Sequence, residues 1–285
     1  MRRRLRLVLL GIMGRAPWAG QTWAYLNWLR AFHRLGHEVW YAEDDSTWPY
    51  DPEQETVTDD CRYAVRHVAT CLARIGLPDR WAFRLVGREG ACWGLEPRRL
   101  DELYRTCDAL FNVEWSTHLR EEHLAAPLRV LIESDPVAPE LRYANGDASV
   151  RAAVEQHHVI VTRGENYGAP DCGVPLGGLE AKYRTTRQPV DLDLWPAAFD
   201  PAATAITTIG HYRQAGCVTY RGEPYYYSKH PEWEKVLELP RRTGRRFEVA
   251  LAVDDPADRA RLEAHGWRLV PPLPMSLDVF GAYPA

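Results

Sequence analysis

The sequence predicts an α/β protein made of two successive doubly wound units with parallel sheets. Short apolar stretches alternate along the chain with longer stretches whose apolar residues recur at helical spacing. Several of the apolar stretches run directly into loops that carry acidic residues. A segment rich in Gly and Pro, residues 171–201, separates a longer first half from a shorter second half.

The individual elements follow from hydrophobic spacing and from residues that start or stop helices. Uninterrupted apolar runs predict strands of the kind that a parallel sheet buries on both faces. Gly36, Gly76 and Gly266 follow amphipathic stretches as helix stops, and Pro97 suits a first helical turn. The predicted strands cover residues 5–12, 37–42, 109–114, 128–133, 158–162, 205–209, 247–253 and 267–270, and the predicted helices cover residues 22–35, 59–75, 96–106, 231–237 and 255–265.

Composition and charge exclude several classes of protein. With 46% hydrophobic and 26% charged residues the chain has the composition of a globular protein, and its net charge of -4 gives no reason to expect a nucleic-acid partner. No apolar run approaches the roughly 18 residues of a membrane span. The basic start is followed by an apolar run that Arg6 interrupts, which favours a core strand over a signal peptide. We therefore expect a soluble, cytoplasmic protein.

The six cysteines and the histidines predict no metal site. No C-x-x-C pair occurs among the cysteines, so neither a zinc site of the usual spacing nor a disulfide framework is expected. His157 and His158 are adjacent at the start of a strand, where successive side chains point to opposite faces. We predict no metal and no cofactor.

The turn after the first strand is a candidate binding site. It contains Gly14, Arg15 and Gln21, and glycine lets backbone amides approach a ligand closely at the start of a helix. The glycine spacing does not match G-x-G-x-x-G, so the dinucleotide fingerprint is missing. The alternative is a turn in which glycine only permits tight packing between strand and helix.

The second strand runs into Glu43, Asp44 and Asp45. An acid at this place binds the ribose of NAD(P) or S-adenosylmethionine in nucleotide-cofactor enzymes, which gives one alternative function. The other interpretation is a solvated acidic loop. Three later strands likewise end in loops that carry Glu114, Asp135 and Glu165.

Several strings resemble a bacterial family of uncharacterised glycosyltransferase-like proteins with two Rossmann-like domains, the GT-B architecture. The resembling strings are residues 11–15, 35–39, 133–136, 162–166 and 239–243. The resemblance implies a Rossmann-like acceptor-side domain over residues 1–198, an incomplete Rossmann-like donor-side domain over residues 199–285, and small-molecule sugar donor and acceptor as partners. It also implies further nucleotide-binding strands after residue 270. If none follows residue 285, we expect binding without turnover; a non-catalytic ligand-binding protein is therefore a third alternative.

Sugar transfer needs a base for the acceptor hydroxyl and cations for the departing diphosphate. Asp135 is our candidate base and Glu165 the second candidate, since both follow apolar strands; a turn, a helix cap or a loop contact is the structural alternative for each. Arg213 and Lys229 are the candidate diphosphate ligands, with exposed loop charges as the alternative. Gly14, Arg15 and Gln21 are the candidate substrate-binding residues. Together these predictions describe a protein that transfers a sugar from a nucleotide-sugar donor to an unknown acceptor.

Overall fold

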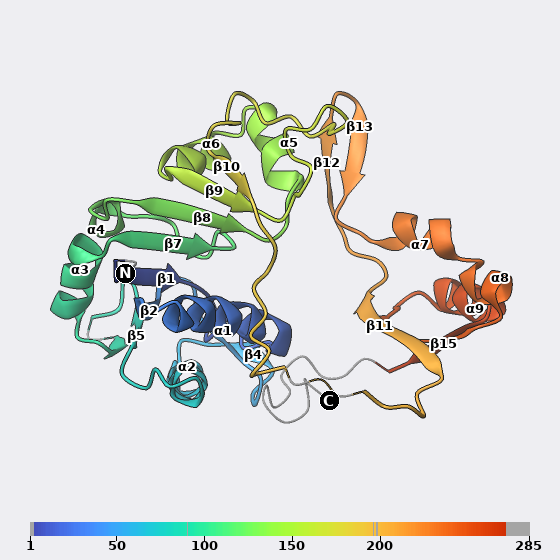
Figure 1. The fold of residues 1–285 in the computed structure, drawn as a ribbon, viewed down its shortest axis with the longest axis horizontal. Helices are drawn as coiled ribbons and strands as arrows, with labels where there is room; N and C mark the ends of the chain where they lie inside the picture. The colour runs from blue at the N-terminus through green and yellow to red at the C-terminus, as the bar shows by residue number, and fades with distance from the viewer. Residues whose placement is uncertain (1–2, 90, 196, 198, 272–285) are drawn as a thin grey trace. The chain divides into compact units, whose positions relative to one another are not determined.

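The computed structural model of the chain describes residues 3–89, 91–195, 197 and 199–271, and it forms two compact units (Figure 1). Unit 1 runs to Pro196, and unit 2 covers Ala197–Pro274. Each unit contains a parallel sheet flanked by helices, so the predicted α/β class with Rossmann-like units is confirmed. The end of the predicted second domain, residues 272–285, lies outside the described residues.

Unit 1 is built on an eight-stranded sheet with the order β10-β9-β8-β7-β1-β2-β5-β6. All neighbours pair in parallel except β6, which is antiparallel to β5. The strands are β1 (Arg6–Leu10), β2 (Glu38–Asp45), β5 (Trp81–Leu85), β6 (Cys92–Gly94), β7 (Ala109–Val113), β8 (Arg129–Glu133), β9 (Val159–Thr162) and β10 (Tyr183–Thr185). The helices are α1 (Ala19–Arg34), α2 (Arg62–Arg74), α3 (Pro97–Thr106), α4 (Glu121–Leu124), α5 (Ala138–Ala144) and α6 (Ala148–Glu155), and a small hairpin joins β3 (Tyr50–Asp51) to β4 (Thr56–Val57).

The strand order reverses direction between β1 and β7. The chain first moves outward from β1 to β2 and β5, then returns across the sheet to β7 and continues to β8, β9 and β10. Such a reversal is a topological switch point, where open α/β sheets bind ligands beyond the carboxyl ends of their strands. The site should therefore be sought after β1 and β7.

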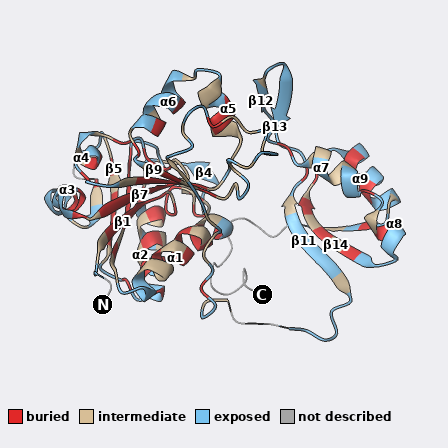
Figure 2. Ribbon diagram, turned by 45° about the horizontal axis from the view of Figure 1, so that its top comes forward, coloured by how far each residue is buried: buried red, intermediate tan, exposed pale blue. Residues whose placement is uncertain are grey.

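Helices cover both faces of this sheet, as a parallel sheet requires. Leu9 of β1 packs in one core with Leu72 of α2, while Val8 and Leu10 pack in another with Leu100 of α3. Figure 2 shows the buried strands between exposed helix surfaces. The continuous apolar run of β1 thus supplies both cores, because successive side chains point to opposite faces.

Unit 2 contains a smaller parallel sheet with the order β11-β14-β15 and a separate two-stranded hairpin. The strands are β11 (Ala205–His211), β12 (Cys217–Tyr220), β13 (Glu223–Tyr226), β14 (Arg246–Ala252) and β15 (Trp267–Val270), and the helices are α7 (His230–Val236), α8 (Leu239–Thr243) and α9 (Pro256–Ala264). Its core joins alternate residues of β14, such as Val249 and Leu251, to Leu262 of α9 and Trp267 of β15.

Several parts of the fold differ from the sequence prediction, among them the helices α4, α5, α6 and α8 and the hairpin β3–β4, where the sequence predicted no element. The short strands β5, β6 and β10 add to the main sheet although the sequence predicted no strand there. β10 lies within the Gly- and Pro-rich segment, and β5 carries Arg84 in its interior. The segment between Arg213 and Lys229, where the sequence predicted no strand, forms the hairpin β12–β13. Short or polar strands carry little hydrophobic periodicity in the sequence. Whether such a segment forms a strand depends on its pairing with an existing sheet.

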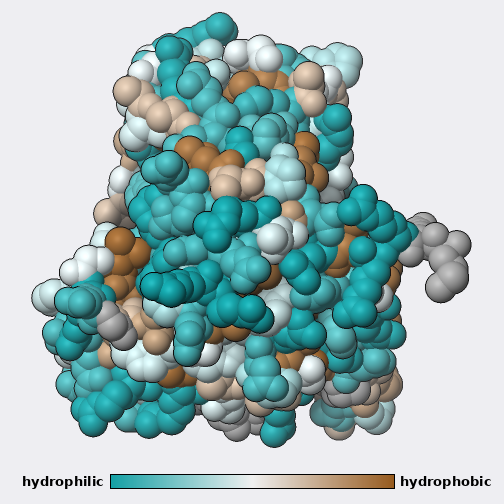
Figure 3. Space-filling view, turned by 90° about the vertical axis from the view of Figure 1, so that its left-hand side faces the viewer, coloured by the Kyte–Doolittle hydropathy of each residue, from teal (hydrophilic) through white to brown (hydrophobic). Residues whose placement is uncertain are grey.

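The face of the molecule on the side of α3 carries few broad apolar areas (Figure 3). Figure 3 shows a mostly hydrophilic face on the side of α3, with hydrophobic side chains in small separate groups. Across the described ranges, no helix has the length and apolar character needed to cross a bilayer.

Candidate binding site at the switch point

A cavity of about 310 Å³ lies at the switch point of unit 1. Its walls come from the turn after β1, the end of β2 and the turn after β7, the three strand ends that the fold brings together there. The lining residues that matter below are Arg15, Asp45, Trp48, Glu114, Trp115 and His118. Hereafter we call it the switch-point cavity.

The turn after β1 is held by a buried carboxylate. The backbone N–H of Gly14 donates to Glu43 Oε1, and that of Arg15 donates to Glu43 Oε2 over 3.0 Å. A Cβ at Gly14 would lie 2.8 Å from Val68 Cγ2 and 3.0 Å from the Ala64 carbonyl oxygen, so only glycine fits against α2. The packing interpretation of this turn therefore applies to Gly14, whose N–H faces Glu43.

Arg15 joins the three walls of the cavity. Its side chain is 7% exposed and forms ion pairs with Glu43 at 3.3 Å and with Asp45 at 3.3 Å. Its Nη2 also donates to the carbonyl oxygens of Gly11 and Ser116, at 3.1 and 3.0 Å. The predicted ligand-binding residue thus holds the end of β2 and the turn after β7 against the turn after β1.

The turn after β7 supplies a carboxylate to the cavity wall. Glu114 and Trp115 both have left-handed backbones, with φ of 58° and 55°. Such residues cost on the order of 1–3 kcal/mol each and persist only where the surrounding structure requires them. Gln21, predicted as a substrate-binding residue, donates from Nε2 to Glu114 Oε2. Gln21 therefore orients a carboxylate of the cavity wall and leaves Glu114 Oε1 available.

The remaining walls are aromatic or titratable. Trp48 is 55% exposed and lines the cavity together with Trp115 and the exposed His118. Asp45 accepts two hydrogen bonds from Thr47 besides its ion pair with Arg15. Burial would raise the pKa of Asp45, but the bonds from Thr47 and the Arg15 charge lower it below the ordinary value. Besides Arg15 and Asp45, the titratable side chains of the cavity wall are Glu114 and His118.

The predicted bases Asp135 and Glu165 lie elsewhere on the same sheet edge. Asp135 is exposed in the loop after β8, and Glu165 is exposed after β9, where it pairs with Arg187 at 2.6 Å. Neither is among the residues that line the switch-point cavity. Their catalytic role stays a prediction. Glu114 also follows an apolar run in the sequence, but no local pattern distinguishes it from Asp135 and Glu165.

The predicted diphosphate ligands belong to unit 2. Arg213 forms an ion pair with Asp258 of α9, and its guanidinium lies 5.8 Å from the Tyr212 ring. Lys229 is the residue that precedes α7, a helix of seven residues. Their role in binding a diphosphate stays a prediction.

The acidic residues that end β2 do not form a solvated loop, so that interpretation was wrong. Glu43 and Asp44 are 0% exposed, and Asp45 is 7% exposed. Asp44 forms ion pairs with Arg84 at 2.5 Å and Arg120 at 2.6 Å. Since the protein's own donors surround Glu43 and Asp44, neither carboxylate is free to bind a ribose. The nucleotide-cofactor alternative loses the residues on which it depended.

Asp44 is the centre of a buried polar cluster. Tyr104 Oη and His123 Nε2 each lie 3.0 Å from Asp44 Oδ2. His123 Nδ1 accepts from the Arg120 N–H, so the ring carries its proton on Nε2. Ligand-type atoms of Asp44, His123 and Glu122 lie within 4.8 Å of one another among the residues described. Arg84 and Arg120 already pair with the carboxylates there, which disfavours a metal ion.

A second pair of buried acids follows β8. Glu133 ends β8 and Glu140 lies on α5, with exposures of 1% and 2%. Glu140 accepts from Tyr183 Oη at 2.7 Å and from the Val137 N–H at 2.8 Å. Burial and the adjacent Glu140 raise the pKa of Glu133 to about 10. Burial and the neighbouring acid therefore both favour the protonated form of Glu133.

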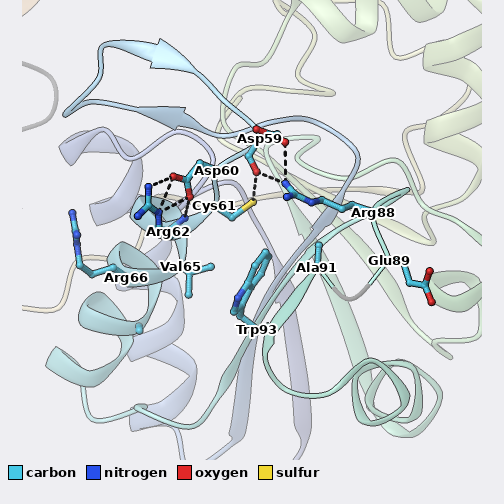
Figure 4. A pocket seen from close by; sticks show the side chains of 11 residues that line it. Asp59, Asp60, Cys61, Arg62, Val65, Arg66, Arg88, Glu89, Ala91 and Trp93 are labelled. Atoms are coloured by element: carbon cyan, nitrogen blue, oxygen red, sulfur yellow. Dashed lines mark hydrogen bonds and ion pairs between the residues drawn. The ribbon is translucent and has the colours of Figure 1, made fainter.

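A larger cavity of about 570 Å³ lies beside α2 and β6 (Figure 4). Three arginines surround it, but Arg62 pairs with Asp60 at 2.5 Å and Arg88 with Asp59 at 3.1 Å. Figure 4 shows these pairs on the rim, above Trp93. Because its charges pair with one another and it lies away from the switch point, the smaller cavity is the better candidate site.

No protein-family model and no characterised protein matches the chain by sequence. Solved structures that resemble it include an alpha-glucosyltransferase in complex with UDP and a 13-mer DNA containing a central A:G mismatch, with 10% identity, a TM-score of 0.48 and coverage of 95% of this chain and 67% of that one. A glycosyltransferase from Rickettsia africae ESF-5 has 10% identity, a TM-score of 0.46 and coverage of 96% and 70%. Phytolacca americana UGT2 complexed with UDP-2fluoro-glucose and pterostilbene has 10% identity, a TM-score of 0.40 and coverage of 94% and 72%. At this identity the likeness concerns the fold alone.

Proposed function

We propose that the protein transfers a sugar from a nucleotide-sugar donor to an acceptor that binds in the switch-point cavity. The observation that carries the proposal is the cavity itself, which lies where open α/β sheets bind ligands and has Glu114 and His118 in its wall. The string resemblance described above supports the reaction class. Unit 1 is then the acceptor side, and unit 2 contributes to donor binding.

The chemistry divides between two side chains of the cavity wall. An acceptor hydroxyl attacks the anomeric carbon of the donor, its proton passes to the His118 imidazole, and the nucleoside diphosphate leaves with the electron pair of the broken bond. Glu114, held by Gln21, accepts a hydrogen bond from a second hydroxyl and orients the acceptor. Asp45 contributes less because Arg15 and Thr47 already engage it.

The donor diphosphate requires cations, and Arg213 and Lys229 are the proposed ligands in unit 2. Negative charge develops on the departing diphosphate, and fixed cations stabilise it. Arg213 would have to exchange its contact with Asp258 for the diphosphate. Arg213→Ala with Lys229→Ala should therefore raise the KM for the donor more than it lowers kcat.

The test is release of nucleoside diphosphate from UDP-, TDP- and GDP-sugars by the full chain in the presence of a mixture of hydroxylated acceptors. The wild type should release diphosphate, and His118→Gln should lower kcat by about 10²-fold or more, as expected for loss of a general base. His33→Gln, an exposed histidine of α1, is the matched control and should have wild-type activity.

Two further variants decide which group is the base. Asp135→Asn and Glu165→Gln test the acids predicted from the sequence, and we expect either to retain most of the activity. A large loss in one of them with full activity in His118→Gln would transfer the role of base to that acid. Absence of both binding and turnover with every nucleotide sugar would contradict the proposed function.

A further inference from the structure

We propose that the ligand of the switch-point cavity carries a protonated amine beside its hydroxyl groups, as an amino sugar does. Its description as an acceptor rests on the proposed function, whereas the preference for an amine rests on the cavity alone. Charge, aromatic walls and size each support the proposal.

The cavity wall has an excess of negative charge. Arg15 is the only Arg or Lys among the described residues that line the cavity, whereas Asp45 and Glu114 both line it. The charge of Arg15 is compensated by Glu43, a buried carboxylate behind the wall that accepts from two backbone N–H groups and from Tyr41 Oη at 2.8 Å. Burial raises the pKa of Glu43, whereas Arg15 and these donors lower it. In either charge state of Glu43, the wall holds two carboxylates, Asp45 and Glu114, against one guanidinium, and an anionic ligand would meet this excess of negative charge.

Glu114 is the group that would receive the amine. Its Oε2 accepts from Gln21, and a carboxylate retains further acceptor sites on the other oxygen. An ammonium donor makes a charge-assisted hydrogen bond, which is about twice as strong as a bond from a neutral hydroxyl. The carboxylate thus distinguishes an amine from the hydroxyl of an otherwise identical sugar.

The aromatic walls favour the same ligand. Trp48 and Trp115 both line the cavity, and Trp48 is 55% exposed. Indole faces stack on the apolar face of a ring and attract a cation that lies within about 6 Å of the ring centre. A volume of about 310 Å³ is at the lower end of the range for ligand pockets and suits a single sugar-sized ring.

The experiment compares three probes of the same size on the full chain by isothermal titration calorimetry. Glucosamine, glucose and glucuronate differ in carrying a cation, no charge or an anion. We expect glucosamine to bind about tenfold more tightly than glucose, a preference of the size given by one charge-assisted bond, and glucuronate to bind more weakly than glucose. Added salt should reduce the preference for glucosamine.

Two variants test the residues named. Glu114→Gln should remove the preference for glucosamine while glucose still binds, whereas Glu155→Gln, an exposed glutamate at the end of α6, should retain it as the matched control. Trp48→Ala should weaken both sugars by roughly fivefold or more, in line with the loss of one stacking ring. Because Trp48 is largely exposed, this second variant should fold even if Glu114→Gln does not.

Equal affinity for the three probes, tighter binding of glucuronate, or an unchanged preference in Glu114→Gln would overturn the inference. Failure of the proposed function gives a different result. A Glu114-dependent preference for glucosamine without release of nucleoside diphosphate from any donor would support the amine site and reject sugar transfer. Release with neutral acceptors and no preference for glucosamine would support sugar transfer and reject the amine site.

Discussion

Asp44 and Glu133 are buried carboxyl groups at the same edge of the sheet of unit 1, and folding shifts their pKa values in opposite directions. Asp44 ends β2 and Glu133 ends β8, with exposures of 0% and 1%. Burial would raise the pKa of Asp44, but His123 and Arg84 lower it well below the ordinary value. For Glu133, burial and Glu140 act in the same direction and raise the pKa to about 10. Two equally buried carboxyl groups can therefore have pKa values shifted in opposite directions, because the neighbouring groups differ.

The largest effect should come from removing the charge of Asp44. Asp44→Asn removes the buried counter-ion of Arg84 and Arg120, which keep only the partly exposed Glu122 and, for Arg84, Asp101. Loss of one partner of a buried ion pair costs about 3–5 kcal/mol. Urea unfolding should show this loss. Asp79→Asn, an exposed aspartate, is the matched control and should change the free energy of unfolding by less than about 0.5 kcal/mol. A loss below about 1 kcal/mol in Asp44→Asn would contradict the central role of Asp44.

A smaller loss should follow from Glu140→Gln. Glu140 accepts from Tyr183 and from the Val137 N–H, and a glutamine has one acceptor oxygen in place of two. A buried donor left without its partner costs about 1–3 kcal/mol, which urea unfolding would detect. Glu155→Gln on α6 serves as the control. An increase in stability on Glu140→Gln would mean that the two acids repel each other as carboxylates.

The smallest change in the free energy of unfolding should come from Glu133→Gln. The way in which this change depends on pH shows whether Glu133 is protonated in the folded protein. Near pH 4, where the wild type has not yet lost stability to this group, the amide replaces a protonated carboxyl of the same shape, so the free energy of unfolding should change by no more than about 1 kcal/mol. Because the folded protein binds a proton that the unfolded chain releases near its ordinary pKa of about 4.3, the wild type loses stability as pH rises from there toward about 10. Glu133→Gln lacks this loss.

The stability of the Glu133→Gln variant relative to the wild type should therefore increase with pH, by at most about 1.4 kcal/mol per pH unit. For Asp44 the contribution to stability changes with pH in the opposite direction. Its pKa is lowered on folding, so its contribution is present above its ordinary pKa of about 3.9 and is lost as the pH falls below that value. Urea unfolding at several pH values measures both trends. A stability difference between Glu133→Gln and the wild type that does not change with pH would show that Glu133 is ionised in the folded protein.

The sequence by itself determined the α/β class and most of its elements. The apolar run of β1 is buried on both faces of the sheet, and the helix stops Gly36, Gly76 and Gly266 have φ of 88°, 80° and 90°, which an L residue rarely adopts. These are local properties, since a hydrophobic run or a glycine stop acts through its immediate neighbours in the chain.

Only the tertiary structure decided which polar residues meet. Glu43 and Asp44 follow one another in β2, yet one holds the turn after β1 and the other binds Arg84 and Arg120. Glu114 and Asp135 both follow apolar strands, but only Glu114 lies at the strand-order reversal and lines the switch-point cavity. The charge of an acid and its access to a ligand depend on partners that lie far away in the chain, and no local pattern specifies them.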